Sequence, residues 1–290
     1  MTKNRIAVLG LGIMGNGIAR NFLEKGYEVT VWNRSPKKCE ALIPLGAKVA
    51  ATPIEACENS DLIFDVTAND ETSTELFCDP DQGLFSVGRK DQVFISCVTL
   101  SLACVKNIAE QAAKSGLVFF DMPMTGSRKG AETGTLTLFV GGDESRFINI
   151  ERDLKAIASD IRYFGPSGSG MKIKLVLNAI QATHVFVFGE SMKRALSIGL
   201  NEQKTGEYLI EKPGGPITSL AWDFYQNPPE QTQFSVKWML KDLKYAKESF
   251  NDFEKSCGLS ANYLDVSIAI LQKAFDAGLG DQDWTMANKI

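Results

Sequence analysis

The sequence predicts an α/β protein in which a doubly wound parallel sheet is followed by an all-helical domain. Short apolar runs alternate with helical or loop segments through the first half of the chain, and a glycine-rich turn follows the first of these runs. After a Gly-Pro-Ser-Gly-Ser-Gly segment at 165–170 the pattern changes to helices alone. We therefore expect a sheet domain over residues 1–166 and a helical domain over residues 167–290.

Five apolar runs suit the parallel strands of the first domain. They are Ile6–Leu9, Val29–Trp32, Leu62–Val66, Val93–Ile95 and Leu117–Phe120. Two further runs, Thr135–Val140 and Ile161–Phe164, bracket a polar helix from about Glu144 to Ser159. We expect these two runs to extend the same sheet at its far edge, and the domain to close near Gly165-Pro166.

The turn after the first strand has the spacing of a dinucleotide site. Its residues are Gly10, Leu11, Gly12, Ile13, Met14 and Gly15, and all six are candidate cofactor contacts. Gly10 permits the tight turn, Gly12 leaves room for a pyrophosphate, and Gly15 lets the next helix pack against the strand. A helical run follows from Asn16 to Lys25 and stops at Gly26, so strand, glycine turn and helix occur in the order of a Rossmann fold. The alternative is a glycine turn in an unrelated α/β protein.

The end of the second strand predicts which nicotinamide cofactor binds. Enzymes that use NAD usually place a carboxylate there, on the ribose 2′-hydroxyl, whereas this chain has Asn33. Arg34, Ser35, Lys37 and Lys38 follow, and they offer a guanidinium, a hydroxyl and positive charge to a 2′-phosphate. We therefore expect NADPH rather than NADH, with an exposed basic loop as the alternative reading.

Composition excludes several function classes. The net charge of −4 gives no reason to expect nucleic acid or an anionic membrane as a partner, and no transmembrane span is visible. Six cysteines without a C-x-x-C pair argue against a disulfide framework or a zinc site, so no metal is expected. The single histidine, His184, lies among apolar residues and reads as structural. These features are typical of a cytoplasmic enzyme with reduced thiols.

The second domain reads as helical throughout. A run from Met171 to about Ser197 predicts one long helix that would span roughly 40 Å and join the two domains. Four further helices are expected at Glu202–Ile210, Ile217–Gln226, Val236–Phe253 and Ala261–Ala277.

Two more segments could carry chemistry. Asp121–Ser127 follows a strand, and its small residues and hydroxyl groups offer donors suited to a carboxylate. The segment Gly168-x-Gly170-x-x-x-Lys174-x-x-x-Asn178 opens the long helix, and its lysine and asparagine share a face.

With these motifs in this order, the chain resembles the β-hydroxyacid dehydrogenase family, which includes 3-hydroxyisobutyrate dehydrogenases and glyoxylate/succinic semialdehyde reductases. The family's G-L-G-x-M-G turn, D-x-P-V-S-G-G loop and G-x-G-x-x-x-K-x-x-x-N helix all have counterparts, as does a later K-D-L segment at Lys241–Leu243. The resemblance covers the whole chain and implies a C-terminal domain like that of 6-phosphogluconate dehydrogenase.

The resemblance also implies roles for individual residues. It makes Lys174 and Asn178 catalytic, and it places Thr125, Gly126, Ser127 and Lys241 at the substrate. Further cofactor contacts are expected at Thr67, Thr99 and Lys241. Three departures, Thr125 for serine, Ser127 for glycine and Met124 for valine, bear on the preferred substrate.

The role of Lys174 also follows from chemistry. Reduction of a carbonyl by hydride leaves an alkoxide that needs a proton, and with the histidine unavailable a lysine is the best remaining donor. Burial and a place near a helix N-terminus should both lower its pKa toward neutral. The alternative is a lysine that only extends from a buried helix to water.

These inferences predict an NADP(H)-dependent oxidoreductase that interconverts a short aldehydo- or keto-acid and its hydroxy acid. Imine reduction is a second possibility, although imine reductases usually carry another residue at the lysine position. A non-catalytic dinucleotide-binding scaffold is a third. By family resemblance we also expect a homodimer or homotetramer.

Overall fold

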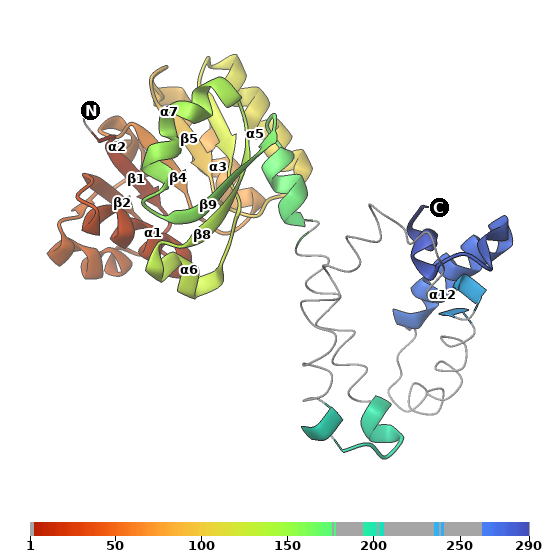
Figure 1. Ribbon diagram of the computed structural model, residues 1–290. Coiled ribbons are helices and arrows are strands. Elements are labelled where there is room, and N and C mark those ends of the chain that lie inside the picture. The colour runs from red at the N-terminus through yellow and green to blue at the C-terminus, as the bar shows by residue number, and fades with distance from the viewer. Residues whose placement is uncertain are drawn as a thin grey trace. The chain divides into compact units, whose positions relative to one another are not determined.

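The computed structural model describes residues 3–175, 177, 194–201, 203–205, 235–237, 239–240 and 263–289. It divides into two compact units, Met1–Ile180 and Gln181–Ile290 (Figure 1). The start of the helix after Gly168 therefore groups with the sheet, and the domain boundary expected at residues 166–167 stays a prediction.

The first unit is built on a nine-stranded sheet with the order β3-β2-β1-β4-β5-β6-β8-β7, and β9 pairs with β8. The strands are β1 (Ile6–Leu9), β2 (Val29–Trp32), β3 (Lys48–Val49), β4 (Leu62–Asp65), β5 (Val93–Ser96), β6 (Val118–Asp121), β7 (Met124–Thr125), β8 (Leu136–Gly141) and β9 (Ala158–Gly165). The six strands from β3 to β6 are parallel, whereas β8 runs antiparallel to β6.

The strand order reverses at β1. Ile6 pairs with Val29 of β2 on one side and with Leu62 of β4 on the other. The chain runs outward from β1 to β2 and β3, and then crosses back to β4. Ligands of open α/β sheets bind where the strand order reverses in this way, so the expected cofactor site lies at this edge.

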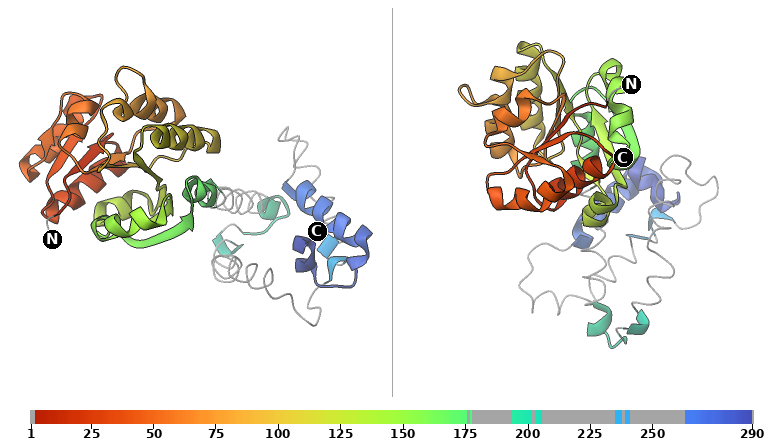
Figure 2. Two further views of the ribbon diagram at one scale, coloured as in Figure 1. Left: turned by 90° about the horizontal axis from the view of Figure 1, so that it is seen from above. Right: turned by 90° about the vertical axis from the view of Figure 1, so that its left-hand side faces the viewer.

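Helices cover both faces of the sheet (Figures 1 and 2). One face packs against α1 (Ile13–Glu24), η1 (Pro36–Leu45), α6 (Ser127–Thr133) and α7 (Glu144–Leu154). The other face packs against α2 (Pro53–Glu58), α3 (Asp70–Cys78), α4 (Leu84–Val87) and α5 (Leu102–Lys114). Because both faces are covered, the central strands β1, β4 and β5 are buried along their whole length.

The apolar runs predicted as strands all form strands, and the expected doubly wound sheet is confirmed. Two details differ. Helix α1 begins at Ile13 rather than Asn16, and α7 ends at Leu154 rather than Ser159. The second difference arises because the chain after α7 enters β9 at Ala158, which pairs with Leu136 and is buried. Tertiary pairing there overrides the helical pattern of the local sequence.

The described part of the second unit is mostly helical, with an isolated antiparallel bridge between Ser235 and Asp283. Helix α12 (Tyr263–Ala274) is followed by η2 (Phe275–Leu279) and η3 (Trp284–Lys289). Val236, Leu240, Leu271, Ala274 and Ala287 form its buried cluster. Most of the long helix expected at Met171–Ser197, and most of the three helices expected between Glu202 and Phe253, lie outside the described residues. Within the described part of the chain, no helix has both the length and the apolar character that a membrane crossing requires.

Candidate active site

The glycine turn after β1 contains two glycines that the fold itself requires. Gly10 has φ +100°, and a Cβ there would lie 2.6 Å from the Val66 carbonyl oxygen. A Cβ on Gly15 would lie 1.8 Å from the carbonyl oxygen of Gly10. Both distances are far below van der Waals contact, so any side chain at these positions would push β1, α1 and the end of β4 apart.

Gly12 is different, because among the described residues a Cβ there meets no atom within 4 Å beyond its own chain neighbours. Its backbone, at φ −71° and ψ −165°, is also open to any residue. Protein packing therefore gives no reason for glycine at this position. A phosphate group that must approach the backbone does give one, so the turn fits the pyrophosphate of a dinucleotide.

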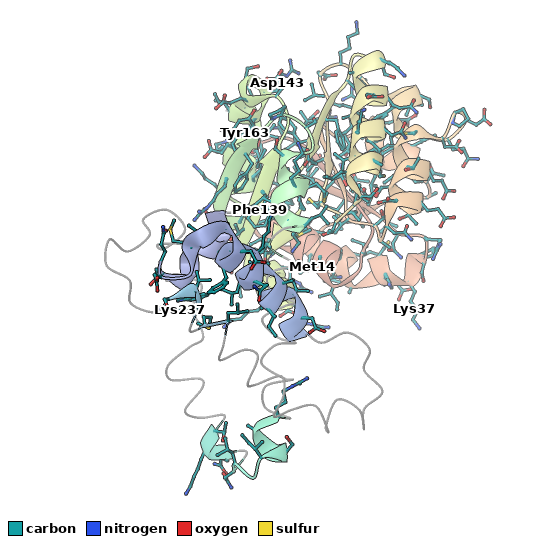
Figure 3. All side chains as sticks on the ribbon, turned by 90° about the vertical axis from the view of Figure 1, so that its right-hand side faces the viewer. Met14, Lys37, Phe139, Asp143, Tyr163 and Lys237 are labelled. Atoms are coloured by element: carbon teal, nitrogen blue, oxygen red, sulfur yellow. The ribbon has the colours of Figure 1, made fainter. Side chains whose placement is uncertain are left out.

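The first turn of α1 completes this part of the site. It carries no acidic residue, so the positive end of the helix is uncompensated there. Leu11 is buried, Ile13 is exposed, and Met14 lies half-buried on the first turn (Figure 3).

Asn33, directly after β2, forms hydrogen bonds with both polar ends of its side chain. Its Oδ1 accepts a hydrogen bond from the Leu11 N–H at 2.8 Å, and its Nδ2 donates to the Ser35 carbonyl at 3.0 Å. Asn33 thus links the turn to the basic loop. The side chains of Arg34, Ser35, Lys37 (labelled in Figure 3) and Lys38 are exposed.

Thr67 lies beside the glycine turn, since its backbone nitrogen would be 3.0 Å from a Cβ on Gly10. Its hydroxyl donates to Asp65 Oδ1 at 2.6 Å, and Ser73 and Ser96 donate to the other oxygen of Asp65. Asp65 is fully buried, and this burial raises the pKa of its carboxyl group, against the effect of these hydrogen bonds. Thr99 follows β5 with an exposed side chain.

The predicted substrate loop, Thr125–Ser127, leads into a helix that packs against α1. Thr125 ends β7 with its side chain half-buried, and Gly126, at φ +121°, turns the chain into α6. Helix α6 then packs on α1, where a Cβ on Gly17 would lie 2.6 Å from the Ala131 carbonyl oxygen. The buried Asn21 side chain of α1 donates to that same carbonyl at 2.8 Å. The structure does not describe the side chain of Ser127.

Lys174 lies on the helix that begins at Ser169, which starts against the end of β6. There the Gly168 and Met171 N–H groups donate to the two carboxylate oxygens of Asp121, at 2.6 and 2.8 Å. Lys174 is half-buried, and burial lowers its pKa below the ordinary lysine value. This is the direction that a proton donor near neutral pH requires.

The first unit thus carries the glycine turn, the basic loop, Thr67, Thr99, the Thr125 loop and Lys174. Asn178 and Lys241 lie outside the described residues. Sequence reasoning gave no role to the buried carboxylates Asp65 and Asp121. The signal that could have found them is an acidic residue at the end of an apolar strand, in Leu62–Asp65 and Val118–Asp121.

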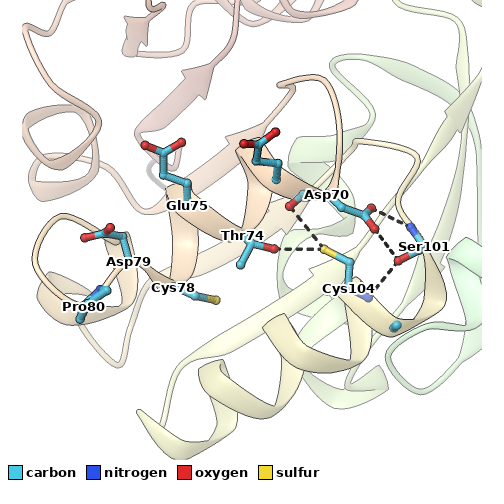
Figure 4. Close-up of a pocket in the computed structure, with 10 residues that line it drawn as sticks. Asp70, Thr74, Glu75, Cys78, Asp79, Pro80, Ser101 and Cys104 are labelled. Atoms are coloured by element: carbon cyan, nitrogen blue, oxygen red, sulfur yellow. Dashed lines mark hydrogen bonds between the residues drawn. The ribbon is translucent and has the colours of Figure 1, made fainter.

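A groove of about 630 Å³ lies apart from these residues, between α3 and α5 (Figure 4). Asp70, Glu75, Cys78 and Cys104 help to line it, and none of the predicted site residues does. Burial raises the pKa of Cys104, and raises that of Cys78 to about 11. Both thiols are therefore protonated at neutral pH and poorly suited to nucleophilic catalysis.

The described cysteines are all free thiols. Within the ranges that the structure describes, no three histidine, cysteine, aspartate or glutamate residues gather in a way that could hold a metal ion.

Known proteins resemble this chain in sequence and in fold. Residues 5–165 match the family model of the NAD binding domain of 6-phosphogluconate dehydrogenase. The chain is 28% identical over 281 residues to glyoxylate/succinic semialdehyde reductase 2, chloroplastic, of Arabidopsis thaliana, covering 97% of this chain and 77% of that protein. It is 27% identical over 256 residues to the mitochondrial 3-hydroxyisobutyrate dehydrogenase of Mus musculus, covering 86% and 76%.

Among solved structures, an imine reductase variant from Myxococcus stipitatus in complex with NAD+ superposes with a TM-score of 0.87. It covers 99% of both chains at 19% identity, and this similarity shows a shared fold. The family match spans the whole sheet domain, and both relatives are oxidoreductases that align over most of the chain. The chain therefore belongs to the NAD(P)-dependent β-hydroxyacid dehydrogenase family, whose dinucleotide-binding domain is that of 6-phosphogluconate dehydrogenase.

Proposed function

We propose that the protein is an NADP(H)-dependent reductase of short aldehydo- or keto-acids, which also catalyses the reverse oxidation of the hydroxy acid. The observation that carries this proposal is the environment of Lys174. The lysine is half-buried with a lowered pKa, and its helix starts on the strand that leads into the Thr125 loop.

Lys174 supplies the proton in this proposal. A bound nicotinamide provides the hydride, and the carbonyl oxygen that becomes an alkoxide takes its proton from Lys174 Nζ. In the reverse direction the neutral amine accepts the proton of the hydroxyl group. A pKa lowered by burial favours both directions, because it reduces the free energy that separates protonated from neutral lysine near neutral pH. Asn178 is proposed to orient the same oxygen.

The substrate carboxylate is proposed to bind at Thr125, Gly126 and Ser127. The backbone turns at Gly126, where N–H groups precede α6, and the Thr125 hydroxyl adds a donor. Lys241 is proposed to reach the same group. The names of both curated relatives specify small carboxylate-bearing compounds, glyoxylate and succinic semialdehyde in one and 3-hydroxyisobutyrate in the other.

The preference for NADPH rests on the loop after β2. Arg34, Ser35 and Lys38 are exposed beside the glycine turn, to which Asn33 braces the loop. No carboxylate stands at the end of β2 to repel a 2′-phosphate. Thr67 and Thr99 are proposed to contact the cofactor farther along the same edge of the sheet.

Imine reduction is the second candidate, because an imine reductase shares the fold over the whole chain. We place it second because Lys174 suits protonation of an alkoxide. The two functions separate in one assay, since imine reduction needs a preformed imine or a carbonyl compound with an added amine.

The test of the proposed function is NADPH oxidation with glyoxylate, succinic semialdehyde, tartronate semialdehyde and methylmalonate semialdehyde. Each acid is paired with an aldehyde of similar size that lacks the carboxylate. We expect turnover of at least one acid and a much lower kcat/KM for its uncharged partner. Equal rates for both members of each pair, or turnover that requires an amine, would contradict the proposal.

We further propose that the protein acts in the cytoplasm as a homodimer or homotetramer, with a cofactor domain over residues 1–166 and a helical domain over residues 167–290. The two relatives carry the words chloroplastic and mitochondrial in their names, so location is a separate measurement. Fractionation of cells tests the location, and light scattering of the purified chain tests the assembly.

A further inference from the structure

Asp121, the last residue of β6, is a buried carboxylate whose partners are backbone groups. Its side chain is fully buried, and its two oxygens accept hydrogen bonds from Gly168 at 2.6 Å and Met171 at 2.8 Å. Within the described part of the chain, no lysine or arginine forms an ion pair with it. The hydrogen bonds at the start of the following helix therefore stabilise the charge of this carboxylate.

We propose that Asp121 is the positioning residue for Lys174, because its carboxylate fixes the start of the helix that carries the lysine. This inference rests on the proposed role of Lys174 as proton donor. Asp121 itself touches neither substrate nor cofactor in the proposal, and it acts only through the helix.

The contact between helix and strand is closer than side chains would allow. A Cβ on Gly170 would lie 2.3 Å from the Phe139 carbonyl oxygen and 2.7 Å from that of Asp121. A Cβ on Gly141, in β8, would lie 2.5 Å from Asp121 Oδ1. Glycines on both sides thus let the helix start reach the carboxylate, which explains Gly170 in the Gly168-x-Gly170 motif without a bound phosphate.

A second contact fixes the same helical turn to the segment that follows β5. Met171 is fully buried in the core between the sheet and α5, and its Sδ accepts a hydrogen bond from the Leu100 N–H at 3.2 Å. Leu100 directly follows Thr99, which is proposed to lie at the nicotinamide. The helical turn is therefore held by β6, which leads into the substrate loop, and by the segment after β5.

Lys174 follows Met171 by one helical turn, so both lie on the same face of the helix. A shift of the helix start would move the lysine relative to Thr99 and Thr125. Displacements of about 1 Å in a reacting geometry can cost on the order of 100-fold in rate. The burial of Asp121 raises its pKa to about 6, so the carboxylate is ionised at neutral pH and accepts both hydrogen bonds.

The test compares Asp121→Asn with Asp153→Asn in the full chain. Asparagine keeps the shape of the side chain, but its amide NH2 replaces one acceptor, so one of the two N–H groups loses its partner. Asp153 is the matched control, because it is also fully buried and bonds to Asn4 at 2.6 Å and Tyr27 at 3.0 Å, away from the helix. For each variant we would measure kcat per folded molecule, the Kd for NADPH, the melting temperature and amide hydrogen exchange.

We expect Asp121→Asn to lower kcat by about 10- to 100-fold with an unchanged Kd for NADPH, and to speed amide exchange at Gly168 and Met171 at least about tenfold. Asp153→Asn should lower the melting temperature and leave kcat unchanged. Gly170→Ala is the second variant, because its Cβ displaces the same helix start without altering the carboxylate, and it should reproduce the loss of kcat.

The inference is overturned if Asp121→Asn keeps the wild-type kcat, if its loss of activity only follows the loss of folded protein, or if exchange at Gly168 and Met171 is unchanged. Failure of the proposed function has a different signature, since wild-type protein would then reduce none of the acids. In that case the exchange measurement alone decides whether Asp121 fixes the helix.

Discussion

Two places in the first unit share a local design, a strand followed by Gly-x-Gly and a helix, yet they differ in what their N–H groups bind. After β1, no atom of the described residues beyond the chain neighbours lies within 4 Å of a Cβ built on Gly12. After β9, the N–H groups of Gly168 and Met171 are already bonded to the carboxylate of Asp121. The N–H groups of the second turn are thus occupied by an internal anion, whereas the first turn is proposed to bind an external one. Glycine spacing alone therefore does not identify a phosphate site.

The largest expected effect on cofactor binding comes from placing a carboxylate in the glycine turn after β1. In Gly12→Asp the new Cβ contacts no other described residue and the backbone is unstrained, but the variant places a carboxylate where the pyrophosphate would approach. Loss of charge-assisted hydrogen bonds of about 1.5–3 kcal/mol each predicts NADPH binding at least about 10- to 100-fold weaker. Fluorescence titration of NADPH measures this effect.

Gly12→Ala adds volume without charge, so in the same titration it should weaken NADPH binding less than Gly12→Asp does. The melting temperature of both variants should stay near that of the wild type, because the fold does not require glycine at this position. Unchanged NADPH affinity in Gly12→Asp would mean that the open turn is not the dinucleotide site.

The second effect concerns the loop that Asn33 braces to the first turn. Arg34→Ala removes the guanidinium proposed to bind the 2′-phosphate, so the Kd for NADPH should rise about tenfold or more while that for NADH changes little. Binding titrations with both cofactors measure the difference. Lys48→Ala, at an exposed lysine of β3 paired with Glu28, is a charge-matched control that should affect neither cofactor. Equal weakening of both cofactors by Arg34→Ala would count against the NADPH preference.

A third effect, on folding rather than on cofactor binding, is a pH dependence of stability at the second turn. Burial raises the pKa of Asp121 from 3.8 to about 6, so the folded protein binds this proton more tightly than the unfolded chain does. The resulting stabilisation is fully present below pH 3.8 and is lost as the pH rises through 6. Relative to Asp121→Asn, the wild type should therefore lose up to about 3 kcal/mol of unfolding free energy between pH 4 and pH 7.

Urea unfolding of both proteins at several pH values between 4 and 7 measures this difference. The subtraction removes the contributions of other titrating groups that the two proteins share. A difference in unfolding free energy that stays constant with pH would show that Asp121 does not titrate in this range.

The same comparison explains what the sequence could predict. The strands β1 and β2 and the turn between β1 and α1 follow from adjacent residues, since apolar runs and glycine spacing are local patterns. The hydrogen bonds between Asp121 and the helix start join residues about fifty positions apart. The packing of Gly17 against Ala131 joins residues that are still farther apart in the sequence. Such contacts depend on the strand order, which local patterns do not contain.

Asn33 illustrates the same limit. Its position predicted a cofactor contact, whereas the structure shows both of its polar ends bonded to backbone, at Leu11 and Ser35. The end of α7 at Leu154 is another case, because pairing of β9 with β8 outweighs the helical pattern that continues to Ser159. Sequence patterns predicted the site, and tertiary hydrogen bonds determine how Asn33 is oriented beside it.

The most direct test of the account is a single-turnover measurement of NADPH oxidation with the preferred aldehydo-acid, in wild type and Lys174→Ala. Loss of the proton donor predicts a rate lower by about 100-fold or more, with the Kd for NADPH unchanged. Lys174→Arg should fail equally, because a guanidinium holds its proton too tightly to donate it near neutral pH. A Lys174→Ala variant that oxidises NADPH at a near-wild-type rate would contradict the role of the lysine and the function proposed from it.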